Sequence, residues 1–202
     1  MISLGFNCYS AQIGVDLGLR FRKSEGYNTG PFDLMFTFYE SFCEIIKNDF
    51  EDFYNRELLK LIDGEGDQRI IHTKYNCIFN HESPDHFNIL GSGEGWTNKY
   101  HFTENNYEKF IERYKNRVEN FRNYIKEAIQ NNKEINFIIC RYNTIPVELD
   151  EVIKNKYSNL KYNILYINDY NPELEKYQLK YLGFNDEDSE ILRFDNFKNN
   201  TE

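Results

Sequence analysis

The clearest pattern in the chain is a helical repeat of apolar positions between residues 105 and 131. Apolar side chains recur there at steps of three and four, which places them on one face of a helix of about 25 residues: Tyr107, Phe110, Ile111, Tyr114, Val118, Phe121, Ile125 and Ile129. Two shorter helices are predicted at 8–18 and 146–157, and the second has Pro146 near its first turn, where a missing N–H costs nothing. The apolar stretch 34–46 predicts a largely buried helix with Asp33 as its N-cap.

Short apolar runs between these helices predict β-strands at residues 2–5, 69–79, 135–140, 162–167 and, as the weakest, 191–194. Strands that alternate with helices are typical of βαβ crossovers, in which helices cover a parallel sheet. We therefore predict an α/β fold, with a mostly parallel sheet of about five strands and helices on both faces. The 202 residues contain no internal repeat and no Pro-rich linker, which predicts a single domain over residues 1–202.

Composition narrows the classes of partner. Lys and Arg number 24 against 33 Asp and Glu, and the resulting net charge of −9 disfavours binding to nucleic-acid backbones and to anionic membrane surfaces. No apolar run approaches the roughly 20 residues of a transmembrane helix, and the first residues do not resemble a signal peptide. The four cysteines have no tight spacing, which favours reduced thiols. We predict a cytoplasmic protein without a nucleic-acid or membrane partner, and leave the oligomeric state open.

Ligand sites in open parallel sheets lie beyond the carboxyl ends of the strands. Polar side chains follow the predicted strands at that edge: Asn7, Cys8, His81, Arg141, Asn143, Asn168 and Asp169. We expect a substrate site there, with Asn7, Arg141 and Asn143 among its binding groups. The alternative is that these residues are polar only because loops generally are.

Cys8 is the strongest candidate for chemistry because it stands where a strand and turn give way to a helix. Peptide dipoles at a helix N-terminus lower the pKa of a thiol from about 8.5, and the free N–H groups there can hold an oxyanion. The alternative is a small residue that packs the turn. Cys43 and Cys140 are expected in the core, and Cys77 has no metal-type spacing to a histidine. We predict neither a metal nor a cofactor.

A base and an anion-binding group are also available in the sequence. His81 directly follows a predicted strand and is the favoured base, with His101 second, although a single histidine is more often structural. Arg113 and Arg117 are four residues apart on the long helix, so they project together and can hold an anionic substrate. The alternative for both arginines is a solvated face paired with glutamates.

Three short motifs resemble a poorly characterised family of bacteria and large viruses that is labelled papain-like cysteine peptidase. The motifs are Ser3-Leu4-Gly5-Phe6-Asn7-Cys8, Gly30-Pro31-Phe32-Asp33 and, as the loosest match, Phe79-Asn80-His81-Glu82. The resemblance covers about residues 3–142. It implies a thiol hydrolase with Cys8 as nucleophile, His81 as base and Asp33 as the carboxylate that orients the base.

A weaker, architectural resemblance links the first strand, turn and helix to SGNH-type hydrolases, with Cys8 where their serine stands. The chain has no Asp-x-x-His near its end, which that family's triad would need. The leading hypothesis is therefore a cysteine-dependent hydrolase or acyl-transfer enzyme acting on an amide or ester of a small molecule or peptide. The alternative is a non-catalytic α/β module that binds a small ligand or a partner.

Overall fold

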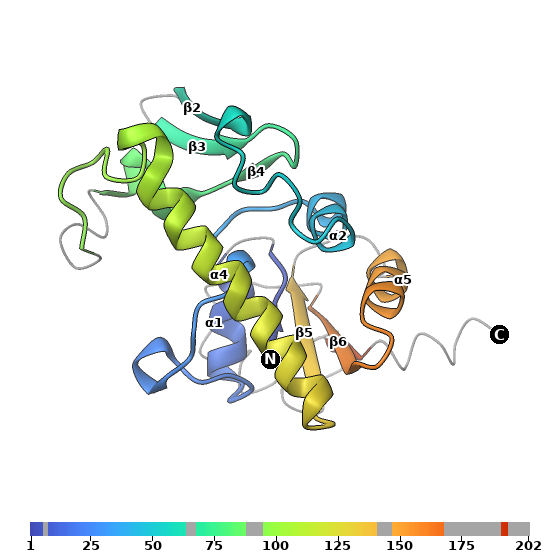
Figure 1. The fold of residues 1–202 in the computed structure, drawn as a ribbon. Helices are drawn as coiled ribbons and strands as arrows, with labels where there is room; N and C mark the ends of the chain where they lie inside the picture. Colours follow the sequence, from blue (N-terminus) through green and yellow to red (C-terminus); the bar gives the residue numbers. More distant parts are fainter. Residues whose placement is uncertain (6–7, 64–67, 88–94, 141–146, 168–190, 194–202) are drawn as a thin grey trace.

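The larger sheet of the protein is parallel at its centre. A computed structural model describes residues 1–5, 8–63, 68–87, 95–140, 147–167 and 191–193, and orders this sheet β1-β5-β6-β7 (Figure 1). The strands β1 (Ile2–Ser3), β5 (Glu134–Cys140) and β6 (Lys161–Ile167) run parallel, and β7 (Ile191–Arg193) is antiparallel to β6. The predicted α/β class with a parallel sheet is confirmed, but three parallel strands are described in it rather than about five.

A second, antiparallel sheet contains the predicted strand that is not part of the parallel sheet. It consists of β2 (Leu59–Asp63), β3 (Gln68–His72) and β4 (Cys77–Ile78), in that order. The single strand predicted at 69–79 is thus two strands joined by a short turn, in which Asn76 has a left-handed φ of 46° that asparagine tolerates. A parallel pair needs a crossover of a dozen or more residues, so a connection this short produces a hairpin instead.

Four α-helices are described. α1 (Tyr9–Asp16), α4 (Glu104–Gln130) and α5 (Val147–Lys156) confirm the helices predicted at these places. α4 runs from the antiparallel sheet to the amino end of β5, so it spans both parts of the fold (Figure 1). None of the helices in the described ranges is long and apolar enough to cross a membrane.

The fourth helix, α2 (Tyr39–Lys47), begins later than its apolar sequence predicts. Phe36 instead forms a β-bridge with Ile78, with N···O distances of 2.8 and 2.9 Å in the two directions. This pairing holds the backbone before α2 in an extended form and ties it to the antiparallel sheet. The N-cap position of α2 is Phe38, so the prediction that Asp33 caps this helix is wrong. Asp33 ends a 3₁₀ turn, η2 (Pro31–Asp33).

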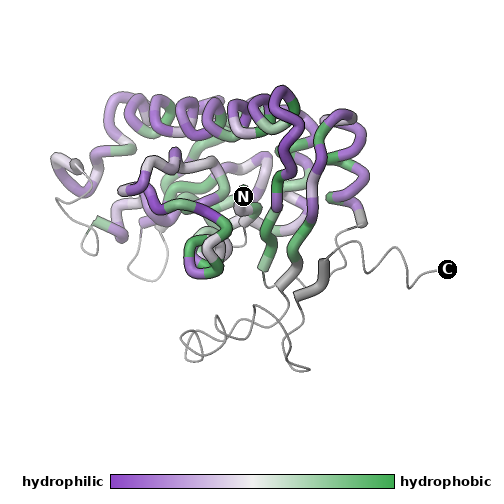
Figure 2. Tube along the Cα trace, turned by 90° about the horizontal axis from the view of Figure 1, so that it is seen from below, coloured by the Kyte–Doolittle hydropathy of each residue, from purple (hydrophilic) through white to green (hydrophobic). Residues whose placement is uncertain are grey.

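Helices cover both faces of the parallel sheet, as predicted. Successive side chains of a strand point to opposite faces, and β5 shows this alternation. Ile138 and Cys140 pack with Ile13 of α1, whereas Phe137 and Ile139 belong to the larger core on the opposite face. Residues of α2, α4 and α5 contribute to that larger core. Figure 2 shows the hydropathy of each residue along the chain: the strands of the parallel sheet are mainly hydrophobic, and α4 alternates between hydrophobic and hydrophilic positions.

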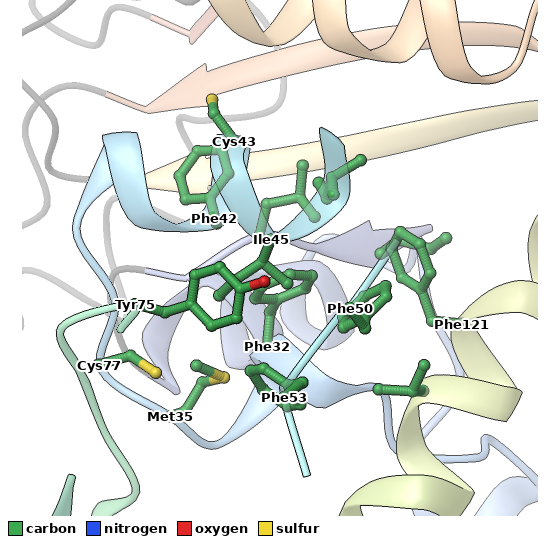
Figure 3. Packing of buried hydrophobic residues seen from close by; sticks show 14 of the residues in the cluster. Phe32, Met35, Phe42, Cys43, Ile45, Phe50, Phe53, Tyr75, Cys77 and Phe121 are labelled. Atoms are coloured by element: carbon green, nitrogen blue, oxygen red, sulfur yellow. The ribbon is translucent and has the colours of Figure 1, made fainter. Parts of the chain in front are cut away.

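Aromatic rings join the two sheets through the larger core. The Phe32 ring centroid lies 5.8 Å from that of Phe50 and 5.9 Å from that of Phe121, so η2 packs directly against α4 (Figure 3). Phe53 continues the cluster toward Tyr75 and Phe79 of the antiparallel-sheet region. Burial of each such ring contributes roughly 1.5–3 kcal/mol, so these contacts stabilise the turn that carries Asp33.

Candidate active site

Cys8 lies between β1 and α1, at the carboxyl end of a parallel strand. The chain turns after β1 with Gly5 at a left-handed φ of 66°, a conformation that favours glycine. The Ser10 hydroxyl donates to the Gly5 carbonyl and braces this turn. Cys8 is the N-cap residue of α1, and its carbonyl accepts a hydrogen bond of 3.0 Å from the Gln12 N–H. The predicted strand–turn–helix setting of Cys8 is confirmed.

The exposure of Cys8 separates it from the other cysteines. Its side chain is half-buried, whereas Cys43, Cys77 and Cys140 are buried. Burial raises the pKa of the Cys8 thiol, and a hydrogen bond with its own backbone lowers that pKa by a smaller amount. Burial has the larger influence because loss of hydration penalises the charged thiolate. Lowering of this pKa by the helix N-terminus stays a prediction. Burial also raises the pKa of Cys43, to about 12.

His81 lies in a 3₁₀ turn, η4 (Asn80–Glu82), directly after β4. Its ring centroid is 4.4 Å from that of His86, and both residues are half-buried. The next residue, Glu82, is completely buried. The predicted site residue therefore adjoins a buried carboxylate that the sequence did not single out.

Glu82 is held by three side chains of α4. Its Oε1 atom lies 2.8 Å from Nη2 of Arg117 and 3.3 Å from Nη1 of Arg113. The Tyr114 hydroxyl donates to Oε2 at 3.0 Å. Burial lowers the pKa of Arg117, but several smaller influences, of which the Glu82 charge is the largest, together outweigh burial. The pKa therefore stays above its usual value and the guanidinium stays charged. The two arginines thus pair with a buried glutamate rather than with glutamates of a solvated helix face.

Asp33 forms a second buried ionic contact. Its Oδ1 accepts from Nη1 of Arg20 at 2.7 Å and from the Ser3 hydroxyl, and its Oδ2 accepts from the Gly30 N–H at 2.7 Å. The carboxylate therefore fastens η2 to β1 and to the segment after α1. None of these donors is a histidine, so the role of Asp33 in orienting a base remains a prediction.

A cavity of about 820 Å³ brings several of the predicted residues together. It lies between residues 20–34 and α4, and Asp33, Arg113 and Arg117 line it. His101 also lines it and contacts the Thr97 hydroxyl at 3.0 Å through Nδ1. Burial, followed by the charges of Arg113 and of a nearby lysine, lowers the pKa of His101.

Other predicted residues are not brought into this cavity. Cys8 and His81 are not among its lining residues. Asn7, Arg141 and Asn143 lie outside the described residues. Within the described ranges, no three His, Cys, Asp or Glu side chains are arranged to hold a metal ion.

Comparison with known families supplies the remaining observation. Residues 1–170 match the model of a family described as "Putative papain-like cysteine peptidase (DUF1796)". The chain belongs to this family. No curated protein and no solved structure matched the chain.

Two residues of the site, Glu82 and Arg20, were not predicted from the sequence. Arg117 carried a usable signal, because it falls three residues after Tyr114 and four before Phe121 and so lies on the apolar face of α4. A buried arginine needs a buried acidic partner, which would have directed attention to Glu82. Arg20 lies outside any periodic segment, and we find no sequence signal for its pairing with Asp33.

Proposed function

We propose that the protein is a cysteine-dependent hydrolase or acyl-transfer enzyme that acts on an amide or ester, with Cys8 as nucleophile. The observation that carries this proposal is the half-buried Cys8 at the N-terminus of α1, in a chain whose other cysteines are buried. Membership of a family described as papain-like cysteine peptidases supports a thiol hydrolase at the level of the family.

The proposed reaction has two halves. The base, His81, removes the Cys8 proton while the sulfur attacks the carbonyl carbon, and the N–H groups that begin α1 stabilise the oxyanion. The bond to the leaving group then breaks, the imidazolium returns its proton to that group, and a thioester remains on Cys8. Water attacks the thioester, releases the acid and restores the thiol, whereas an acceptor amine or alcohol in place of water gives acyl transfer.

The raised pKa of Cys8 defines what the base must do. A thiol whose pKa lies above its ordinary value is almost entirely protonated near neutral pH, so a preformed thiolate is scarce. Attack then requires proton removal in the same step, and general-base assistance contributes typically 10²–10⁴-fold. Asp33 is the proposed orienting carboxylate, and Asn7, Arg113, Arg117, Arg141 and Asn143 are the proposed substrate-binding groups.

The test is acylation of the intact protein by p-nitrophenyl acetate, followed by mass mapping of the acetyl group. We expect the label on Cys8, release of p-nitrophenol, and loss of both in a Cys8→Ser variant. A His81→Ala variant should acylate about 100-fold or more slowly, with His101→Ala as the matched comparison. Labelling of another residue, or equal rates in wild type and His81→Ala, would contradict the assignment of nucleophile or base respectively.

The second candidate function is a non-catalytic module that binds a small ligand. The cavity favours it, because arginines line that cavity and Cys8 does not. A protein that resists acylation at Cys8 but binds a ligand in the cavity would support the module and exclude the hydrolase.

A further inference from the structure

We propose that the cavity between residues 20–34 and α4 binds a phosphate monoester group of a small-molecule ligand. This inference goes beyond the proposed function, because binding of the phosphate requires no chemistry at Cys8. It starts from the walls of the cavity. The Asn120 amide donates to the Thr29 carbonyl at 3.0 Å, and the Tyr124 hydroxyl accepts from the Asn28 N–H at 2.8 Å. These two hydrogen bonds fasten residues 28 and 29, within the 20–34 wall of the cavity, to α4.

The cavity is positively charged in an acidic protein. Five cationic side chains line it: Arg20, Lys23, Lys109, Arg113 and Arg117. Its lining contains two carboxylates, Asp33 and Glu112, and the buried Glu82 lies against two of the arginines. Cations therefore outnumber carboxylates here even with Glu82 included, although the whole chain has a net charge of −9. Such a local excess attracts an anion.

Arg117 supplies the specific observation that points to a ligand. Its side chain is only 7% exposed, and its Nη2 atom is paired with Glu82. Its Nη1 atom is buried without a hydrogen-bond partner among the described residues, and so is Nε of Arg20. A buried donor without a partner is unfavourable, and a guanidinium is always charged. An oxyanion in the cavity would accept from these donors.

Aromatic rings hold the three guanidinium groups in place. Arg20 lies 4.1 Å from the ring centroid of Tyr27, Arg113 lies 4.3 Å from that of Phe102, and Arg117 lies 4.6 Å from that of Tyr114. Each of these arginines is also paired with a buried carboxylate. Side chains that are fixed before the ligand arrives lose little conformational entropy when it binds.

The charge and size of the cavity favour a phosphate monoester over a carboxylate. The five cations exceed the three carboxylates by two, which matches the charge of about −1.5 to −2 on a phosphate monoester at neutral pH. Guanidinium groups match phosphate oxygens with paired N–H donors. A volume of about 820 Å³ suits a small molecule.

The test is titration of the full chain with inorganic phosphate at constant ionic strength, followed by calorimetry and by tryptophan fluorescence. Trp96 is the single tryptophan of the chain, and its ring centroid lies 4.9 Å from that of Phe102, which lines the cavity. We expect saturable binding of phosphate, at least about tenfold tighter than binding of acetate. Absence of saturable phosphate binding, or equal binding of acetate, would overturn the proposal.

Substitutions of cationic side chains test whether phosphate binds in this cavity. An Arg117→Lys substitution keeps the charge but loses the planar fork, and should weaken phosphate binding about tenfold. Lys109→Ala and Lys115→Ala form a matched pair on α4, because they remove the same charge and only Lys109 lines the cavity. We expect about threefold weaker binding for Lys109→Ala and no change for Lys115→Ala.

Equal losses in the two lysine variants would mean that phosphate responds only to net charge, and would overturn the site even if Arg117→Lys fails to fold. A Cys8→Ser variant should bind phosphate as the wild type does. Failure of the hydrolase assignment would appear as absence of Cys8 acylation in the wild type with phosphate binding intact, whereas failure of this site would appear as absence of saturable phosphate binding, whatever the acylation result.

Discussion

Cys8 and Glu82 both follow the end of a strand, but the ionisable groups at the two places differ in how burial changes their charge. The Cys8 thiol moves toward its neutral form, whereas Arg117, which pairs with Glu82, stays charged. Tyr9, the residue after Cys8, packs against the apolar cluster that contains Ile13 and Ile138. Burial is the largest influence on the Cys8 thiol, and it raises the pKa. Burial is also the largest single influence on Arg117, which pairs with Glu82, but the Glu82 charge and the smaller raising influences together outweigh it and the group stays ionised.

The comparison shows that a charged partner, rather than burial itself, decides whether a group remains ionised. Two buried charges that face each other in good geometry compensate each other's loss of hydration, whereas a single one is pushed toward neutrality. The free energy of unfolding should therefore depend on the charge of Glu82, which pairs with Arg113 and Arg117. Around Cys8, the folded state should favour the protonated thiol.

The largest expected effect is that of Glu82→Gln. The substitution leaves Arg113 and the buried Arg117 without their shared carboxylate, and should reduce the free energy of unfolding by about 3–5 kcal/mol. Urea unfolding measures this loss. The control is Glu112→Gln, an exposed carboxylate on α4 paired with Lys109, which should change stability by about 0.5 kcal/mol or less. Similar small effects for both variants would show that the buried pairs contribute little.

Asp33→Asn should have the next largest effect, a loss of about 1–3 kcal/mol. The amide keeps an acceptor oxygen for Gly30 or Ser3 but removes the charge that faces Arg20. The loss is smaller than at Glu82 because one arginine rather than two depends on this carboxylate. Asp16→Asn, at an exposed side chain, is the control for the same urea measurement. A loss at Asp33 no larger than at Asp16 would contradict the positioning of η2 through this contact.

The last expected effect is a dependence of stability on alkaline pH, which is small just above pH 8.5 and grows with pH. Cys43 has a pKa of about 12 in the folded protein and about 8.5 when unfolded, so the folded state retains its proton over this range. Its stabilising contribution is complete below about pH 8.5 and falls by about 1.4 kcal/mol per pH unit as the pH rises toward 12. A Cys43→Ala variant should lose this part of the slope.

Urea unfolding of the wild type and of Cys43→Ala between pH 8.5 and 10 measures how the free energy of unfolding of each depends on pH. Cys8→Ser serves as the comparison, and should remove less of the slope because its thiol is half-buried rather than buried. An equal reduction of the slope by both variants would show that exposure does not distinguish the two thiols.

Local sequence patterns accounted for most of the elements. The apolar repeat of α4 and the apolar runs of β5 and β6 determine their structure within a few neighbouring residues, and all three were predicted near their observed bounds. The prediction of a mostly parallel sheet was confirmed, but its number of about five strands was wrong because an apolar run does not reveal which strand it pairs with. The pairing of Phe36 with Ile78 likewise outweighed the helical pattern before α2.

The sequence alone determined the setting of Cys8, because a strand, a glycine turn and a helix are local features. The sequence also contained a signal for the burial of Arg117, whose spacing from Tyr114 and Phe121 falls on the apolar face of α4, but this signal was not used. Only the tertiary structure decided that Arg113 and Arg117 share Glu82, since Arg113 and Glu82 are 31 residues apart in the chain. It also decided the direction in which the pKa of Cys8 moves, because burial depends on how distant segments pack together rather than on the residues beside the thiol.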